Sequence, residues 1–258
     1  MIDTFASQIA STGITVRPRH FHISKDHRSL LGRSLALRFG LVLYMLMHAS
    51  AIAVSLYGEW FVDSVINEKF RDAVEAYDAG VILDSYSNNI NIASILVMLY
   101  CIVTYCMFVH RAASNIENAS AKGLSVTPGW AVGWSFIPFV NLFKIYQIMR
   151  EIWTASADPK RGVRGGSAIL AIWWICYVTG NIVSQTAGRM ADSALRSATP
   201  YLDELKTVFW LQAGGSVLGF LAGLILFIVV GGITRNQARW KSIPVEEPPA
   251  PAANALGF

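Results

Sequence analysis

Four long apolar stretches decide what this chain can fold into. They are residues 35–57, 89–109, 167–188 and 208–234. Each is long enough to cross a bilayer as a helix, which takes roughly 20 mainly apolar residues for about 30 Å of hydrocarbon. None contains Asp, Glu or Lys, and their single Arg, Arg38, stands at the entry to the first. The sequence therefore predicts an all-α integral membrane protein with four transmembrane helices.

The composition agrees with this class. Of the 258 residues, 53% are hydrophobic and 15% are charged, whereas a soluble domain carries about 25% charged residues. The formal net charge is +4. Because Lys and Arg next to membrane spans act as topology signals, the excess needs no nucleic acid to explain it. The lipid bilayer is the expected partner, and no nucleic-acid partner is expected.

The distribution of Lys and Arg predicts the orientation. Six lie in residues 1–38 and seven in 110–166, whereas 58–88 contains two, together with seven acidic residues. Loops rich in Lys and Arg stay in the cytoplasm. We therefore expect both termini and residues 110–166 on the cytoplasmic side of the membrane.

Several segments surround the predicted spans. Residues 1–34 form a basic arm without the apolar core of a cleavable signal peptide, so the first span is expected to act as an uncleaved signal anchor. In 59–84, apolar residues recur every three or four positions, which predicts an outer amphipathic helix. The polar run 85–91 predicts a turn that starts the second span. Residues 35–240 thus form the membrane domain, and the Pro- and Ala-rich tail 241–258 is expected to be disordered.

The last span carries a face of small residues. Gly215, Gly219 and Gly223 follow one another at intervals of four, and without Cβ atoms they let two helices approach closely. One interpretation is packing against another span of the same chain. The alternative is contact with another membrane protein or with a second copy of this chain.

Residues 125–156 suit neither a transmembrane helix nor a soluble one. Pro128 fits the first turn of a helix, and Trp130 and Trp134 favour the headgroup boundary. Pro138 then breaks the helix. The apolar run around it is only about 22 Å long if helical, and if it crossed the membrane, the basic residues after it would lie outside. We therefore predict a re-entrant or interfacial element on the cytoplasmic side, with a fifth span as the alternative.

The second half of this segment has the pattern of an amphipathic helix. Its apolar side comprises Leu142, Ile145, Tyr146, Met149, Ile152 and Trp153, and its polar side Lys144, Gln147, Arg150, Glu151 and Thr154. The candidate ligand or structural site comprises Trp130, Trp134, Pro138, Asn141, Tyr146, Arg150, Glu151 and Trp153. In one interpretation these residues close the cytoplasmic end of the helix bundle. In the other they face a lipid-accessible cavity and bind something.

The same segment resembles a known family. The run TPGWAVGWSFIPFVNLFKIYQIMREIW is similar to the "sPGWAVGWwFiPfvNLwrPyqamreiW" block of a bacterial membrane family called domain of unknown function 4328. The run from Arg111 to Asn115 resembles a shorter block of that family, whereas Lys144 and Ile145 stand where it often has Arg-Pro. The resemblance implies a small multi-pass protein of the bacterial cytoplasmic (inner) membrane, and it implies no activity.

No constellation for metal, cofactor or catalytic chemistry stands out. His48 lies midway along the first span and His110 at the end of the second, about 20 Å apart along their helices, so they cannot share a haem or a metal ion. His48 is interpreted as a neutral histidine bonded across helices, with a proton relay as the alternative. The group His20, His22, Asp26 and His27 matches no zinc-site spacing, and the three cysteines lie within spans without metal-site spacing.

These observations favour a non-enzymatic integral membrane module, as an accessory, assembly or lipid-contacting subunit. Catalytic residues and cofactors are not expected, since no nucleophile, phosphate-loop or zinc-protease motif is present. One alternative is a small transporter or channel that uses the broken helix at Pro138 and Asn141. The other is a lipid-acting intramembrane enzyme, which would need a polar cavity that joins His48, or Arg150 and Glu151, to another polar side chain.

Overall fold

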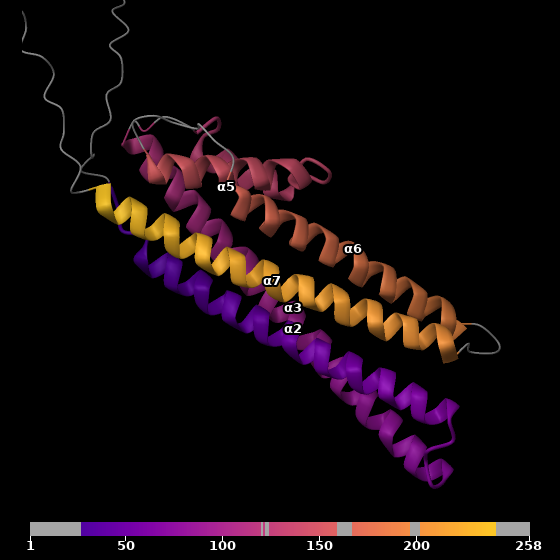
Figure 1. Ribbon diagram of the computed structural model, residues 1–258. Coiled ribbons are helices and arrows are strands. Elements are labelled where there is room, and N and C mark those ends of the chain that lie inside the picture. The colour runs from indigo at the N-terminus through magenta and orange to yellow at the C-terminus, as the bar shows by residue number, and fades with distance from the viewer. Residues whose placement is uncertain (1–26, 120, 122–123, 159–166, 197–201, 241–258) are drawn as a thin grey trace, which may run out of the picture.

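The computed structural model describes residues 27–119, 121, 124–158, 167–196 and 202–240, and every regular element within them is a helix (Figure 1). The long helices are α2 (Leu31–Ile66), α3 (Ala73–Asn118), α6 (Ala168–Arg196) and α7 (Leu202–Arg239). All four are long and apolar enough to cross a membrane. The predicted four-span all-α fold is thereby confirmed. Most of the predicted basic arm, the predicted tail, and His20, His22 and Asp26 lie outside the described residues.

The long helices pack in a fixed order. Helices α2 and α7 form the central pair, α3 packs against α2, and α6 packs against α7 (Figure 1). Three short elements, α4 (Pro128–Gly133), the 3₁₀ helix η1 (Trp134–Phe136) and α5 (Asn141–Ala157), lie at one end of the bundle. There α4 packs on α3, while α5 contacts α3, α6 and α7. We call this end the α5 end.

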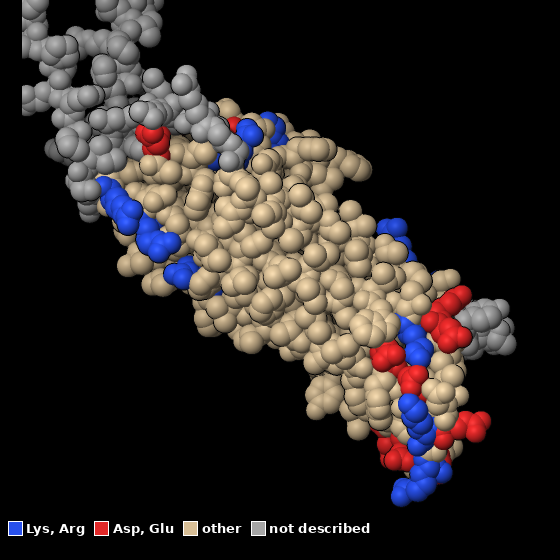
Figure 2. Space-filling model, viewed as in Figure 1, with Lys and Arg blue, Asp and Glu red and all other residues tan. Residues whose placement is uncertain are grey.

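The opposite end of the bundle holds the turn between α2 and α3 and the first residues of α7, and we call it the acidic end. Figure 2 shows most of the visible Asp and Glu gathered there. The Lys206 ammonium group of α7 lies 2.6 Å from an Asp63 carboxylate oxygen of α2, and Lys69 lies 2.6 Å from the other oxygen. One carboxylate thus joins the ends of two long helices, although ion pairs as exposed as these add little stability.

The turn between α2 and α3 lies elsewhere than the sequence pattern indicates. The segment 59–84, predicted as one amphipathic helix, is divided, because α2 continues to Ile66 and α3 begins at Ala73. The predicted turn at 85–91 lies inside α3. Capping explains the difference. The Asp72 carboxylate accepts hydrogen bonds from the backbone N–H groups of Val74 (3.1 Å) and Glu75 (2.9 Å), which satisfies two free donors of the new helix.

The tightly packed core lies at the α5 end. Its fully buried side chains include Phe108 of α3, Met149 and Ile152 of α5, and Val229 and Ile233 of α7. Towards the acidic end, few large apolar side chains of the described residues are fully buried. The bundle is therefore closed at one end and looser along the other half.

The predicted glycine face of α7 is covered by other helices of this chain. Gly215 faces Ser184 of α6, and Gly219 faces the imidazole ring of His48 on α2. A Cβ atom at Gly223 would lie 2.9 Å from the Tyr44 ring. Packing within the chain thus uses all three glycines, and contact with a second copy through this face would have to displace α2 or α6.

Replacement of Gly219 by Val tests this packing. The new side chain would meet the His48 ring, and overpacking of this kind costs about 1–3 kcal/mol. We expect the free energy of unfolding, measured by titration with sodium dodecyl sulfate in dodecylmaltoside micelles, to fall by that amount. Gly214→Val is the matched control, because a Cβ at the exposed Gly214 meets no atom within 4 Å and the helix-propensity change is the same. Equal losses in the two variants would contradict the packing described here.

Candidate functional site

The segment predicted to contain a broken helix does contain one. Thr127 has an extended backbone and Pro128 stands in the first turn of α4, where a missing N–H costs nothing. After η1 the helix stops, and α5 begins at Asn141. Between them Phe139 has a φ of 62°, a left-handed conformation that is costly for a bulky residue. The strain at Phe139 shows that the surrounding turn holds it in place.

This turn carries a patch of exposed large apolar side chains. We call the patch the apolar tip, and its members are Trp130, Phe136, Phe139, Leu142 and Phe143. Phe139 is 82% exposed and Phe143 is 76% exposed. Exposed large apolar side chains grouped in one short segment indicate a candidate site of contact with protein or membrane.

Two cationic side chains lie against aromatic rings behind the apolar tip. The Lys144 ammonium nitrogen lies 5.7 Å from the centre of the Trp134 ring, and the Arg150 guanidinium carbon lies 5.9 Å from the centre of the Tyr146 ring. Both distances are within the range of cation–π attraction. The Trp130 and Trp134 rings are 5.1 Å apart. The region therefore combines apolar surface with nearby positive charge.

Glu151 is buried and holds the segment before α4. Its carboxylate accepts hydrogen bonds from the Ser125 backbone N–H (3.0 Å), the Ser125 hydroxyl (2.9 Å) and the Gln147 amide (2.9 Å). The Lys144 ammonium group in turn donates to the Gln147 carbonyl oxygen (2.9 Å). Three donors already satisfy the Glu151 carboxylate, so its role in this arrangement is to anchor α4 to α5.

A second polar cluster joins three helices at the same end, and we call it the polar junction. The Asn115 amide of α3 donates to the Gln237 carbonyl oxygen of α7 (2.9 Å), and the Gln237 amide donates to the Ser156 hydroxyl of α5 (3.0 Å). Asn115 also exchanges two hydrogen bonds with the backbone of Arg28. The indole N–H of Trp240 donates to the Ser156 carbonyl (3.0 Å). All of these amide and hydroxyl groups are buried, so the junction fixes α5 against the bundle.

The structure distributes the remaining predicted site residues differently from the sequence pattern. Glu151, placed on the polar side of α5, is buried with Met149 and Ile152, whereas Leu142 is exposed. In the described part of the chain, no ion pair joins Glu151 to Arg150. Trp153 packs over Gly232 of α7, where a Cβ atom would lie 2.6 Å from the ring. Glu151 and Leu142 therefore depart from the two faces predicted for α5.

Pro138 and Asn141 flank the strained turn, on the exposed side of the segment. Pro138 is exposed and Asn141 is half-buried, and the Asn141 backbone N–H donates to the Ile137 carbonyl (3.0 Å). Trp134 lies deeper, and its indole N–H is buried without a hydrogen-bond partner among the described residues. The break is thus closed by backbone hydrogen bonds.

The two histidines of the first spans lie apart from this site. The His48 ring contacts the Tyr44 ring, at 4.4 Å between centroids, and packs over Gly219. His110 is exposed near the end of α3. Among the described residues, no group of three or more His, Cys, Asp or Glu side chains is placed to hold a metal ion.

Sequence reasoning missed several residues that matter at the α5 end. Phe136, Phe139 and Phe143 were absent from the candidate site because an apolar residue in an apolar run gives no sign of exposure. Ser156 and Gln237 were missed because their partners are far away in the chain. One signal could have pointed to Gln237. It follows Val230 and Ile233 at helical spacing, so it is a polar residue on the buried, otherwise apolar face of α7.

Removal of the Glu151 carboxylate should release the segment before α4. We expect Glu151→Ala to raise the hydrogen-exchange rate of the Ser125 amide roughly ten- to hundredfold, since hydrogen bonds to a charged group contribute about 1.5–3 kcal/mol. Exchange is measured by mass spectrometry on the purified protein. Arg150→Ala serves as the control, because the Arg150 side chain makes no hydrogen bond to the described residues of this segment. A Ser125 amide that exchanges at an unchanged rate in Glu151→Ala would refute the anchoring role.

Truncation of Gln237 should loosen the polar junction. Gln237→Ala removes one hydrogen bond from each of the buried side chains of Asn115 and Ser156, at a cost of about 1–3 kcal/mol. The free energy of unfolding in mixed micelles should fall by this amount. Asn236→Ala, a truncation at the preceding residue, should leave it nearly unchanged. Comparable effects of the two truncations would show that the junction adds no stability.

Comparison with known proteins bears on this architecture. A family model described as "Domain of unknown function (DUF4328)" matches residues 71–235, which is more than half of the chain and extends from the start of α3 into α7. No curated protein and no solved structure matches the chain. The matched range contains the broken helix, the apolar tip and Glu151. The chain belongs to the DUF4328 family.

Proposed function

We propose that this protein is a non-enzymatic membrane module that contacts lipid through its α4–η1–α5 element. The apolar tip would lie in the headgroup region of the leaflet at the α5 end. The observation that carries the proposal is the exposure of Phe136, Phe139 and Phe143 around one turn.

Burial energy favours this placement. Complete burial of a Phe side chain is worth about 1.5–3 kcal/mol, so three exposed Phe residues in water would be a large loss. Trp130 is 55% exposed beside them, and an indole ring prefers the membrane–water boundary. The tip has the composition of an element that lies in the interface plane.

The anchoring of α5 supports the same role. Glu151 ties α5 to the segment before α4, and the polar junction ties the end of α5 to α3 and α7. These hydrogen bonds hold α5 against the bundle while the Phe side chains of the turn before it stay exposed. An exposed apolar turn is suited to a partner that supplies apolar surroundings, as acyl chains do.

Nearby positive charge adds a second attraction. Lys144 and Arg150 lie behind the apolar tip, and the Arg150 Nε atom has no hydrogen-bond partner in the described part of the chain. Basic groups at this level attract anionic headgroups, by about 1 kcal/mol each. The count of Lys and Arg predicts that this end of the protein lies on the cytoplasmic side, where the anionic lipids of the leaflet would face these groups.

The alternatives receive less support from the geometry. A transporter would need its broken helix inside a water-filled path, whereas Pro138 and Phe139 are exposed at the tip. Of the two places where a lipid-acting enzyme would need a polar cavity, Glu151 has its carboxylate satisfied by Ser125 and Gln147. His48 does line a groove with other polar side chains, but among the described residues no acidic side chain lines it. An accessory or assembly role is compatible with an element that contacts lipid.

Depth measurement on a spin-labelled protein tests the proposal. Phe139→Cys is labelled in a background where Cys101, Cys106 and Cys176 are replaced by Ala, and the protein is reconstituted into vesicles that contain phosphatidylglycerol. Oxygen is enriched inside the bilayer and a polar nickel complex is depleted there. We therefore expect oxygen to raise the spin-relaxation rate of a label at 139 more than the nickel complex does. Ala157→Cys, exposed at the end of α5, is the matched water-facing position and should show the reverse order. If the label at 139 relaxes as the label at 157 does, the tip is in water and the proposal fails.

A further inference from the structure

A polar groove lies among the four long helices, away from the α5 end. It has a volume of about 250 Å³ and is lined by residues of α2, α3, α6 and α7. Its polar side chains include His48, Asn91, Ser94, Asn181, Ser184 and Gln212. All of these residues fall inside the four apolar stretches of the sequence, so the groove lies at membrane depth.

The groove offers hydrogen-bonding groups that the protein itself leaves unused. In the described part of the chain, the side chains of His48, Asn91 and Gln212 make no hydrogen bond. Asn181 uses one N–H, which donates to the Tyr177 carbonyl (2.7 Å). At membrane depth, an unpaired amide or imidazole is costly, because no bulk water replaces the missing partner. Partners from outside the chain would remove this cost.

The lining also limits the charge of such a partner. Among the residues that the structure describes, no Asp, Glu, Lys or Arg side chain lines the groove. An ion would lose its hydration there without gaining a counter-charge. Amides, hydroxyls and an imidazole offer both donors and acceptors, and they suit an uncharged group that carries hydroxyl or carbonyl oxygens.

The groove is accessible from the side of the bundle. Asn91 of α3 and Asn181 of α6 are both exposed, and these two helices flank the central pair formed by α2 and α7. A molecule dissolved in the bilayer can therefore reach the polar side chains between α3 and α6. Entry from the lipid favours an amphiphile over a water-soluble ligand.

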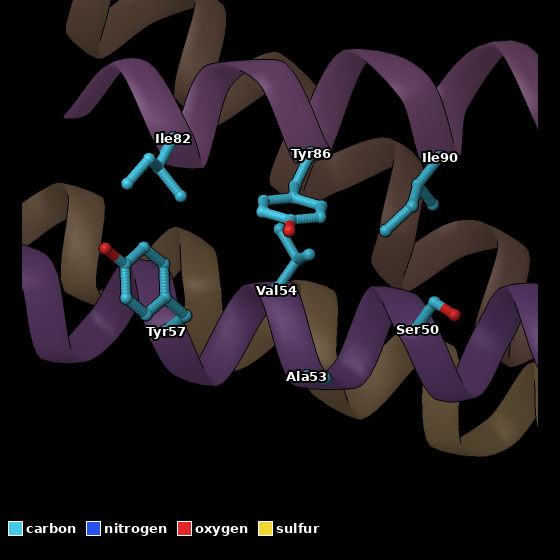
Figure 3. A pocket seen from close by; sticks show the side chains of 7 residues that line it. All are labelled: Ser50, Ala53, Val54, Tyr57, Ile82, Tyr86 and Ile90. Atoms are coloured by element: carbon cyan, nitrogen blue, oxygen red, sulfur yellow. The ribbon is translucent and has the colours of Figure 1, made fainter. Parts of the chain in front are cut away.

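An apolar pocket adjoins the groove. It has a volume of about 470 Å³, lies between α2 and α3, and shares Ile90 with the groove. Figure 3 shows Tyr86 between Ile82 and Ile90 on α3, with its ring towards Val54 of α2. The pocket provides apolar surface next to the polar groups, as a molecule with a polar head and an apolar tail requires.

We propose that the groove binds the uncharged, hydrogen-bonding headgroup of a membrane amphiphile, with part of its tail in the adjoining pocket. Two classes of lipid share this chemistry: glycerolipids with a free hydroxyl group, and isoprenoid quinones with ring carbonyls. The inference is independent of the apolar tip, because the groove and the tip lie on different elements.

Binding of two probes, dioleoylglycerol and decylubiquinone, tests the inference, with dioleoylphosphatidylglycerol as a charged competitor. Purified full-length protein in detergent is incubated with a probe and separated from the excess by size exclusion, and the retained probe is measured by mass spectrometry. We expect saturable retention of at least one uncharged probe and no competition by the charged lipid. Saturation by dioleoylglycerol alone assigns a hydroxyl headgroup, and saturation by decylubiquinone alone assigns a carbonyl headgroup.

Matched variants locate the bound probe. Asn91→Leu removes one amide of the groove and should weaken binding by about tenfold, whereas Asn89→Leu, two residues away on the same helix and outside the groove, should leave the affinity within about twofold. Ala51→Phe should fill the groove and abolish binding, and Ala49→Phe, at an exposed position of α2, should not. If a variant fails to fold, the other pair decides.

Three outcomes would overturn the inference. Retention of the uncharged probes that rises without saturation would mean simple partition into the detergent micelle. Equal competition by dioleoylphosphatidylglycerol would mean that the site does not select an uncharged head. Equal affinities within both variant pairs would mean that the probes bind elsewhere.

Discussion

The hydrogen bonds from Asn115 to Gln237 and from Gln237 to Ser156 are the interaction on which the arrangement of this protein depends. They connect α3, α7 and α5 at one end of the bundle. Asn115 also donates to the backbone carbonyl of Arg28, which ties the segment before α2 to the same place. Buried amides are costly when they are left unpaired, so each of these groups requires the others. These hydrogen bonds fix the position of the short helix α5 against the long helices. The exposure of the apolar tip follows from that placement.

The same end of the bundle also contains the close packing of the protein. Buried side chains of α3, α5 and α7 form the core there, whereas the half towards the acidic end is packed around glycines and a histidine. The ion pair between Lys206 and Asp63 joins α7 to α2 at that end, but exposed ion pairs contribute little. The protein is therefore well closed at one end and open between α3 and α6, which is the side on which the polar groove lies.

Much of this fold can be predicted from the sequence, because hydrophobic length and helix breakers are local properties. The four spans and the break at Pro138 depend only on neighbouring residues. The division of 59–84 was missed because the apolar spacing runs through the turn without interruption, and the Asp72 cap decides where α3 begins. The burial of Glu151 was missed because its partner, Ser125, lies 26 positions away. Partners at such distances become visible only when the helices are assembled.

Polar groups inside a membrane protein need hydrogen-bond partners, and Glu151 and His48 differ in whether their own chain supplies them. Glu151 is buried and accepts hydrogen bonds from three donors of its own chain, so it stabilises the fold. His48 is packed by Tyr44 and Gly219 but shares its groove with Asn91 and Gln212, whose amides make no hydrogen bond among the described residues. If close packing were the purpose of these positions, apolar residues of the same size would serve better. Three side chains that line one groove from three helices, His48, Asn91 and Gln212, make no hydrogen bond among the described residues, and a bound polar molecule explains them better than helix packing alone.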